Sequence, residues 1–256
     1  MNNYALITGS TCGIGKSLAE KFAQEKINLL LVSRDIVKLN QQAEWLNKQY
    51  EIDVIVIESD LTENNSAEAV YEKVKQLDIN VQYLINNAGF SECGSFLETD
   101  FDNEIAMINI HITCITKMMK LFIPDMIKNK CGYILNIGSI GSYMPCPYNS
   151  VYGAAKGYVL LVSNAIGYEL KNTSVSITTL CPGATNTSFA TRAGIENSLL
   201  FKYGVMEADK VARIGYNALI KRKRYAIPGV YNKLLVFSSK IMPLSISNYL
   251  TKIMLQ

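Results

Sequence analysis

The amino-acid sequence predicts a doubly wound α/β fold, in which one central parallel sheet of about seven strands has helices on both faces. Short apolar runs recur along the chain, each bounded by turn residues, and segments with helical periodicity lie between them. Runs this apolar are typical of strands buried on both faces, as in a parallel sheet covered by helices. At 256 residues and 49% hydrophobic content, the chain can bury one large core. No internal repeat, low-complexity tract or linker marks a second domain.

The expected strands follow one another in a βαβα pattern that supports this fold class. Each run is short enough for a strand, and each ends at small, polar or turn-forming residues. In chain order the expected strands cover residues 4–8, 28–33, 53–58, 81–86, 132–138, 175–181 and 224–227.

Composition excludes several classes of function. A net charge of +3 with 18% charged residues and no basic stripe argues against nucleic acid as a partner. The basic run 221–224 follows a helical pattern and is expected to complement the helix dipole. Six cysteines without a CxxC pair, and a single histidine, predict neither a metal site nor a disulfide framework. No secretory signal or membrane span is visible, so a cytoplasmic location is expected.

The first strand runs into the glycine-rich sequence TGSTCGIG, which opens a helical segment. Glycines at such a turn let the backbone approach a pyrophosphate, and the free amides at the helix start favour its negative charge. The spacing is not GxGxxG, but the position after the first strand indicates dinucleotide binding. The residues expected to contact the cofactor here are Gly9, Ser10, Thr11, Gly13, Ile14 and Gly15.

The second strand ends at Ser33 and Arg34, where dinucleotide folds commonly have an acidic residue for the ribose 2′-hydroxyl. A carboxylate would repel a 2′-phosphate, whereas a guanidinium can bind it through two charge-assisted hydrogen bonds. NADP(H) is therefore expected in preference to NAD(H). The alternative is that Arg34 is a solvated residue ahead of the next helix.

The third and fourth strands end in further candidate cofactor contacts. Asparagine amides can tie neighbouring strand ends together, and small residues leave room for a flat ring against the backbone. The alternative for the NNAG sequence is an ordinary tight turn. The expected contacts are Asp60, Leu61, Asn87, Ala88 and Gly89.

Residues 100–128 predict a long helix packed on the sheet, with a buried stripe at Ile105, Ile108, Ile112, Ile115 and Met119. Asn109 and His111 interrupt this pattern. A polar amide inside a helix can break the local hydrogen-bond ladder and hold water. A single histidine in a buried helix is more often structural than catalytic, so His111 is not assigned a role.

Tyr152 and Lys156 lie four residues apart in a segment with helical character, which places both side chains on one face. A cation beside a phenol stabilises the phenolate and lowers the pKa of the tyrosine. The pair is thus a candidate acid/base catalyst. Tyr148 lacks such a partner, because the residue four positions beyond it is Tyr152.

With these motifs placed, residues 4 to about 228 resemble the short-chain dehydrogenase/reductase family, a single-domain Rossmann-type fold. The resemblance rests on TGSTCGIG, Asp60, NNAG, Asn109, Ser139, YGAAK (152–156) and CPGATNT (181–187), which occur in this order. It implies hydride transfer between a nicotinamide and a carbonyl carbon. It also implies a catalytic tetrad of Asn109, Ser139, Tyr152 and Lys156.

The resemblance assigns a role to each tetrad residue. Tyr152 would protonate the carbonyl oxygen and Ser139 would hydrogen-bond it. Lys156 would lower the pKa of Tyr152 and bind the nicotinamide ribose, and Asn109 would hold a water that connects Lys156 to solvent. Ser139 is preferred over Ser142 and Ser150 because of its distance from Tyr152.

The sixth strand ends in CPGATNT, where a Pro-Gly turn would pass beside the nicotinamide. A threonine there can bind the carboxamide or a phosphate, and Thr187 fits the family spacing better than Thr185. The alternative is a simple turn with ordinary threonines. The expected contacts are Pro182, Gly183, Thr185 and Thr187, together with Tyr152 and Lys156.

Residues 1–228 are expected to form the catalytic domain, with 188–206 as a substrate lid and 229–256 as an apolar extension of the same domain. The apolar lid suggests a hydrophobic substrate such as a fatty-acyl, steroid or lipid-like carbonyl, although these residues could merely pack on the sheet. Pro243 is expected to separate two short helices. The extension could complete the pocket, meet a second subunit or lie on a membrane surface.

The expected function is therefore an NADP(H)-dependent carbonyl reductase or alcohol dehydrogenase that acts on a small molecule. By the resemblance it would pair into homodimers or homotetramers through the helices at 100–128 and 152–170. One alternative is a regulatory protein that binds the nucleotide without catalysis. Another is dehydration or epimerisation on the same fold.

Overall fold

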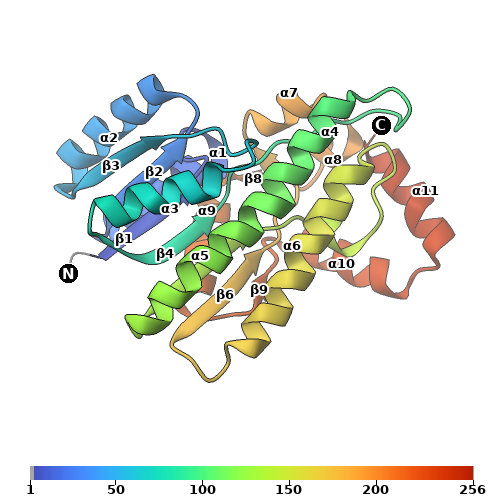
Figure 1. Ribbon diagram of the computed structural model, residues 1–256. Helices are drawn as coiled ribbons and strands as arrows, with labels where there is room; N and C mark the ends of the chain where they lie inside the picture. Colours follow the sequence, from blue (N-terminus) through green and yellow to red (C-terminus); the bar gives the residue numbers. More distant parts are fainter. Residues whose placement is uncertain (1–2, 256) are drawn as a thin grey trace.

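The computed structural model describes residues 3–255 and confirms the doubly wound α/β fold (Figure 1). All seven strands of the central sheet are parallel, in the order β3-β2-β1-β4-β5-β6-β9. Each lies within one residue of its predicted bounds at either end. They are β1 (Asn3–Thr8), β2 (Asn28–Ser33), β3 (Val54–Glu58), β4 (Asn80–Asn86), β5 (Gly132–Ile137), β6 (Val175–Leu180) and β9 (Tyr225–Ala226).

The helices cover both faces of the sheet, because successive strand side chains point to opposite sides. On one face, Ala5 and Ile7 of β1 pack with α1 (Gly13–Gln24), α2 (Ile36–Tyr50) and α9 (Ala208–Ile220). On the other face, Leu6 of β1 belongs to the cluster formed by α3 (Ser66–Gln76), α5 (Ile115–Lys128) and α6 (Ser150–Glu169). The strand order changes direction at β1 and β4, and ligands of such sheets bind in the crevice at this point.

The predicted long helix at 100–128 is divided by a π-helix. It comprises α4 (Phe101–Ile108), a π-helix (Asn109–Cys114) and α5. The predicted buried stripe is wrong in its first half, since Ile105 is 40% exposed while Met107 and His111 are buried. The wider turns of a π-helix change which residues share a face, and an α-helical period does not reproduce them.

By length and composition alone, Phe101–Lys128 could cross a membrane, with a mean hydropathy of 1.3. In this fold, however, Met118, Met119 and Phe122 of the same helix are buried in the core against the sheet.

The remaining elements lie beyond the carboxyl end of β6. The predicted lid segment contains α7 (Phe189–Ala193) and α8 (Leu199–Lys202), flanked by the paired strands β7 (Thr185–Asn186) and β8 (Met206–Glu207). Then follow α10 (Val230–Ile241) and α11 (Leu244–Leu255), with Pro243 between them as predicted. Figure 1 shows both helices in red at one side of the molecule, where α11 packs against α8.

Candidate active site

A cleft of about 800 Å³ opens at the carboxyl ends of the strands. It extends from the glycine turn after β1, past the ends of β4, β5 and β6, to α10 and α11. Eighteen of the predicted site residues line it: Gly9, Thr11, Gly13, Ile14, Ser33, Arg34, Asp60, Leu61, Asn87, Ala88, Gly89, Ser139, Tyr152, Lys156, Pro182, Gly183, Thr185 and Thr187. Ser10, Gly15 and Asn109 are not part of the lining.

Ser10 and Gly15 shape the glycine turn from behind. A Cβ atom on Gly15 would lie 2.2 Å from the carbonyl oxygen of Gly9 and 2.3 Å from Asn87 Nδ2, so only glycine fits this position. Ser10 is fully buried, and its carbonyl oxygen accepts a hydrogen bond of 3.0 Å from Gln42 Nε2. Neither residue lines the cleft, and the contact of each with the cofactor stays a prediction.

Asn87 ties the ends of β1 and β4 together, as predicted. Its Nδ2 donates to the carbonyl oxygens of Thr8, at 2.9 Å, and Gly9, at 3.0 Å. The backbone amides of Asn87 and Ala88 both donate to Thr8 Oγ1. These bonds fix the two strand ends relative to each other at the point where the strand order reverses.

Arg34 and Asp60 meet at the ends of β2 and β3. Arg34 Nη1 lies 3.6 Å from Asp60 Oδ2, and the Arg34 side chain is 68% exposed. Asp60 also accepts two hydrogen bonds from Thr62, one from its amide and one from its hydroxyl. Burial would raise the pKa of Asp60, but these bonds and the Arg34 charge outweigh it and lower the pKa. The carboxylate is thus occupied within the protein, while most of the guanidinium faces the cleft and solvent.

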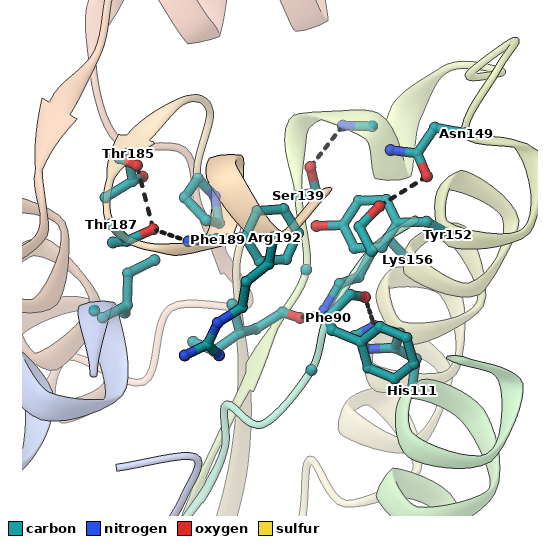
Figure 2. A pocket seen from close by; sticks show the side chains of 18 of the residues that line it. Phe90, His111, Ser139, Asn149, Tyr152, Lys156, Thr185, Thr187, Phe189 and Arg192 are labelled. Atoms are coloured by element: carbon teal, nitrogen blue, oxygen red, sulfur yellow. Dashed lines mark hydrogen bonds between the residues drawn. The ribbon is translucent and has the colours of Figure 1, made fainter. Parts of the chain in front are cut away.

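Ser139, Tyr152 and Lys156 converge midway along the cleft (Figure 2). Ser139 follows β5 and caps a short 3₁₀-helix (Ile140–Tyr143), with its Oγ accepting from the Gly141 amide at 3.1 Å. Tyr152 and Lys156 lie one turn apart on α6, as predicted, and the Lys156 ammonium is 5.5 Å from the centre of the Tyr152 ring. Lys156 Nζ also donates to the carbonyl oxygen of Ile137 at 2.7 Å.

Burial is the largest cause of the pKa shifts of Lys156 and Tyr152. It lowers the pKa of Lys156 from 10.5 to about 7. It also raises the pKa of Tyr152 above its usual range, although a hydrogen bond with Ser139 acts in the opposite direction. The pKa of Tyr152 is thus raised, because the loss of solvent outweighs the hydrogen bond with Ser139. The expected lowering of this pKa by Lys156 stays a prediction.

His111 lines the cleft in the place expected for Asn109. Its side chain is completely buried, and Nε2 lies 2.8 Å from the carbonyl oxygen of Phe90. The His111 ring lies beside that of Tyr152, as Figure 2 shows. Sequence reasoning assigns His111 no role, because a single histidine in a buried helix is more often structural than catalytic. The signal that could have found it is its place two residues after Asn109, where the apolar pattern is interrupted.

The contact between His111 and Gly89 explains why a glycine ends the NNAG sequence. A Cβ atom on Gly89 would lie 2.1 Å from Cε1 of the His111 ring. Burial, followed by the Lys156 charge, lowers the pKa of His111 well below 6.5, so the imidazole is neutral. Since Phe90 offers only an acceptor, Nε2 carries the proton and the buried Nδ1 is an acceptor with no protein partner among residues 3–255.

The two threonines after β6 occupy different positions. Thr185 Oγ1 donates to the Gly183 carbonyl oxygen at 3.0 Å. Thr187 reaches the glycine turn, since a Cβ atom on Gly13 would lie 2.9 Å from Thr187 Cγ2. Thr187 is therefore the one that closes the cleft over the turn.

The far end of the cleft is apolar. Phe90, Ile140, Met144 and Phe189 line it from the main domain, and Leu200 and Phe201 from α8. The two C-terminal helices contribute Leu235, Met242, Leu250, Met254 and Leu255. Residues 229–255 thus supply one wall of the cleft.

The cleft fits an extended dinucleotide. Its glycine turn accepts close backbone approach at the start of α1, where free amides favour a pyrophosphate. From there it is continuous to Lys156 and Tyr152. Within residues 3–255, no three His, Cys, Asp or Glu side chains gather in a geometry suited to a metal ion.

Comparisons with known proteins agree with this architecture. A family profile described as short chain dehydrogenase matches residues 3–197. Human very-long-chain 3-oxoacyl-CoA reductase is 33% identical over 188 residues, which cover 71% of this chain and 59% of that protein. The chain thus aligns with less than two thirds of the length of this relative.

Two solved structures are similar over nearly the whole chain. A short-chain dehydrogenase from Sphingobium yanoikuyae in complex with NADPH has 30% identity and a TM-score of 0.83, covering 94% of this chain and 95% of the other. The bulky-bulky ketone specific alcohol dehydrogenase from Comamonas testosteroni has 26% identity and a TM-score of 0.79, covering 94% of each. The fold, the cleft and these matches together show that the chain belongs to the short-chain dehydrogenase family.

Proposed function

We propose that this protein is an NADP(H)-dependent oxidoreductase that transfers a hydride between the nicotinamide and a carbonyl or alcohol group of a hydrophobic substrate. The observation that carries the proposal is the convergence of Ser139, Tyr152 and Lys156 in one cleft with the glycine turn. A binding module would need the turn but not these three side chains. The convergence therefore favours catalysis over a purely regulatory role.

The cofactor would lie along the cleft from Arg34 to Pro182. Backbone amides at Gly13 and Ile14 would bind its pyrophosphate, and Arg34 would bind a 2′-phosphate. Ser33 brings no carboxylate to this position, which favours NADP(H) over NAD(H). The preference rests on Arg34 and Ser33, since similar dehydrogenases have been solved both with NADPH and with NAD.

The bound nicotinamide would supply or accept the hydride. In the reduction direction, Tyr152 donates its phenolic proton to the carbonyl oxygen, and Ser139 hydrogen-bonds the same oxygen as negative charge develops on it. Burial raises the pKa of Tyr152, so the phenol is protonated at neutral pH and has a proton to donate. Lys156, when protonated, stabilises the phenolate that remains.

We further propose that His111, rather than Asn109, completes this group as a positioning residue. Its bond to Phe90 fixes the loop after β4, and its ring supports Tyr152 from the side. The proton path predicted for Asn109 would then pass by His111 Nδ1, a buried acceptor close to Lys156.

The apolar end of the cleft defines the substrate class. Aliphatic and aromatic side chains from α8, α10 and α11 surround the space beyond Tyr152 and Phe189. They suit a fatty-acyl, steroid or other lipid-like carbonyl. The names of two relatives, a very-long-chain 3-oxoacyl-CoA reductase and a bulky-bulky ketone specific alcohol dehydrogenase, point the same way.

We place residues 1–228 and 229–256 in one domain, with 188–206 as the substrate lid, because α10 and α11 share the cleft with the lid helices. We also propose a homodimer or homotetramer paired through the helices at 100–128 and 152–170. The exposed Leu161 of α6 offers apolar surface for such pairing. A cytoplasmic location stays a prediction.

The test is NADPH oxidation against a panel of carbonyls that includes short ketones, steroids and long 3-oxoacyl thioesters. We expect turnover that rises with the apolar size of the substrate and is lost in Tyr152→Phe. Tight NADPH binding without turnover on any substrate would favour the regulatory alternative. Activity of Tyr152→Phe equal to that of the wild type would contradict the proposed mechanism.

A further inference from the structure

The two C-terminal helices expose more apolar surface than the usual surface helix does. On α10, Val230, Leu234, Phe237 and Ile241 form a stripe at helical spacing and are 72%, 62%, 63% and 72% exposed. The buried side of the same helix is not uniformly apolar, since it includes Asn232 and Val236, which are 2% and 3% exposed. An amphipathic helix on a protein surface normally buries its apolar side and exposes its polar side.

The next helix repeats this arrangement. Leu244 and Tyr249 of α11 are each 64% exposed, whereas Ser247 and Thr251 are buried. Figure 1 shows α10 and α11 together at one side of the molecule. We use the name outer face for the exposed apolar side chains of both helices, namely Val230, Leu234, Phe237, Ile241, Leu244 and Tyr249.

The inner sides of these helices carry both apolar and polar side chains, and they line the cleft. Ser238 and Ser239 of α10 and Ser247 and Thr251 of α11 line the cleft. The helices therefore separate the substrate end of the cleft from whatever contacts the outer face. An apolar outer face at this place is suited to a phase that also holds hydrophobic substrates.

The charges on the same two helices indicate which kind of partner would bind the outer face. Residues 229–256 contain Lys233, Lys240 and Lys252 but no aspartate or glutamate. Lys233 and Lys240 are exposed beside the apolar stripe of α10. Apolar side chains flanked by lysines are the pattern of helices that lie in the interface of anionic membranes.

A second copy of this chain fits the outer face less well. A two-fold contact would bring identical surfaces together. The lysines of one copy would then face those of the other, with no acidic residue within 229–256 to neutralise them.

We infer that the outer face of α10 and α11 binds the surface of an anionic lipid bilayer, with the mouth of the cleft beside the lipid. The side chains of the stripe enter the headgroup region, and the lysines contact anionic headgroups. This inference does not depend on the proposed reaction, because binding would occur whether or not the enzyme turns over.

The test is flotation of the purified full chain with vesicles of phosphatidylcholine, alone or mixed with phosphatidylserine. We expect the wild type to float with the mixed vesicles, less with phosphatidylcholine alone, and less at high salt. Phe237→Ser/Ile241→Ser should weaken flotation at least about tenfold by removing apolar surface. Lys233→Glu should weaken it roughly tenfold, mainly at low salt.

The matched control is Val37→Ser/Trp45→Ser, whose side chains on α2 are 61% and 46% exposed. It should float like the wild type, and unchanged Tm values would show that all variants fold. A wild type that stays at the bottom with both vesicle types would overturn the inference. So would a control that loses as much binding as the α10 variant. If the wild type does not float and the α10 variant changes the oligomeric state in size-exclusion chromatography, the outer face is an interface between copies.

Discussion

The ring of His111 lies edge-on to the ring of Tyr152, with centroids 5.6 Å apart and an interplanar angle of 81°. The same imidazole is bonded to the Phe90 carbonyl oxygen, so it links the loop after β4 to the phenol on α6. Two rings in T-shaped contact restrict each other's rotation. His111 thereby fixes the orientation of Tyr152 without needing to contact the substrate.

His111→Ala should lower kcat for carbonyl reduction by roughly tenfold to a hundredfold, because the phenol loses its lateral support. The KM for NADPH should change little, since the glycine turn is remote from this contact. His111→Asn should recover part of kcat, because an amide can still donate to Phe90. Asn109→Ala is the control and should keep kcat within about threefold, as expected for a residue outside the cleft lining. Steady-state kinetics would check this, and equal losses in both alanine variants would contradict it.

Gly89→Ala should destabilise the protein by about 1–3 kcal/mol, because the added methyl group overlaps the imidazole of His111. In a His111→Ala background the same substitution should cost less, since the overlapping ring is gone. Urea unfolding of the four proteins gives this coupling. Gly157→Ala is the matched control, because its Cβ atom would meet only the Ser142 carbonyl oxygen, at 3.8 Å. An equal cost of Gly89→Ala in both backgrounds would show that the two residues are not in contact.

Tyr152→Phe and Ser139→Ala should each lower kcat by about 10²-fold or more, because they remove the proton donor and the partner of the carbonyl oxygen. Binding of NADPH, measured by fluorescence titration, should persist in both. The nearby Tyr148→Phe and Ser150→Ala serve as controls and should retain activity, since neither residue lines the cleft. If only the control variants lost activity, the assignment of Tyr152 and Ser139 as the catalytic tyrosine and serine would be wrong.

Arg34→Glu should reduce the ratio of kcat/KM for NADPH over that for NADH by at least about tenfold. It replaces a partner of the 2′-phosphate by a repelling carboxylate, which also faces Asp60 at the ends of the strands. Lys48→Glu, an exposed change of the same charge on α2, should leave the ratio unaltered. An unchanged ratio in the Arg34 variant would indicate that Arg34 is a solvated surface residue and does not bind the 2′-phosphate.

Lys156 should make stability depend on pH above neutrality. Its pKa is about 7 in the folded chain and 10.5 for an unperturbed lysine, so the unfolded chain binds more protons between these values. The free energy of unfolding of the wild type should therefore rise with pH from about 7 to 10, relative to that of Lys156→Met. Below pH 7 the difference should level off. Urea unfolding at several pH values tests this, and parallel curves for the two proteins would contradict it.

Most of the fold was predictable because it depends on patterns within single segments. Each of the seven strands of the central sheet is a short apolar run, and the glycine turn has its expected place after β1. Pro243 also separates two helices, since proline cannot continue the helix before it. These features need no knowledge of distant contacts.

The candidate site was less predictable where it depends on contacts between segments. Ser139, Tyr152 and Lys156 reach the cleft as expected. Asn109 does not, because the π-helix changes the face that the chain presents there. The ionisation of Tyr152 also could not be predicted, since its burial involves Phe189 and the end of β5, which are far apart in the sequence. Nor did the sequence show that α10 and α11 expose apolar side chains while Asn232, Ser247 and Thr251 on them are buried.

The π-helix makes the number of residues between α4 and α5 as important as their identity. A π-helical segment behaves as an α-helix that contains one extra residue. Removing a single residue from Asn109–Cys114 would allow a continuous α-helix. Because each residue of an α-helix turns by about 100°, the side chains ahead of the deletion would then rotate by that angle about the axis. The position of the imidazole at the cleft is therefore sensitive to insertions and deletions that leave every cleft-lining side chain unchanged.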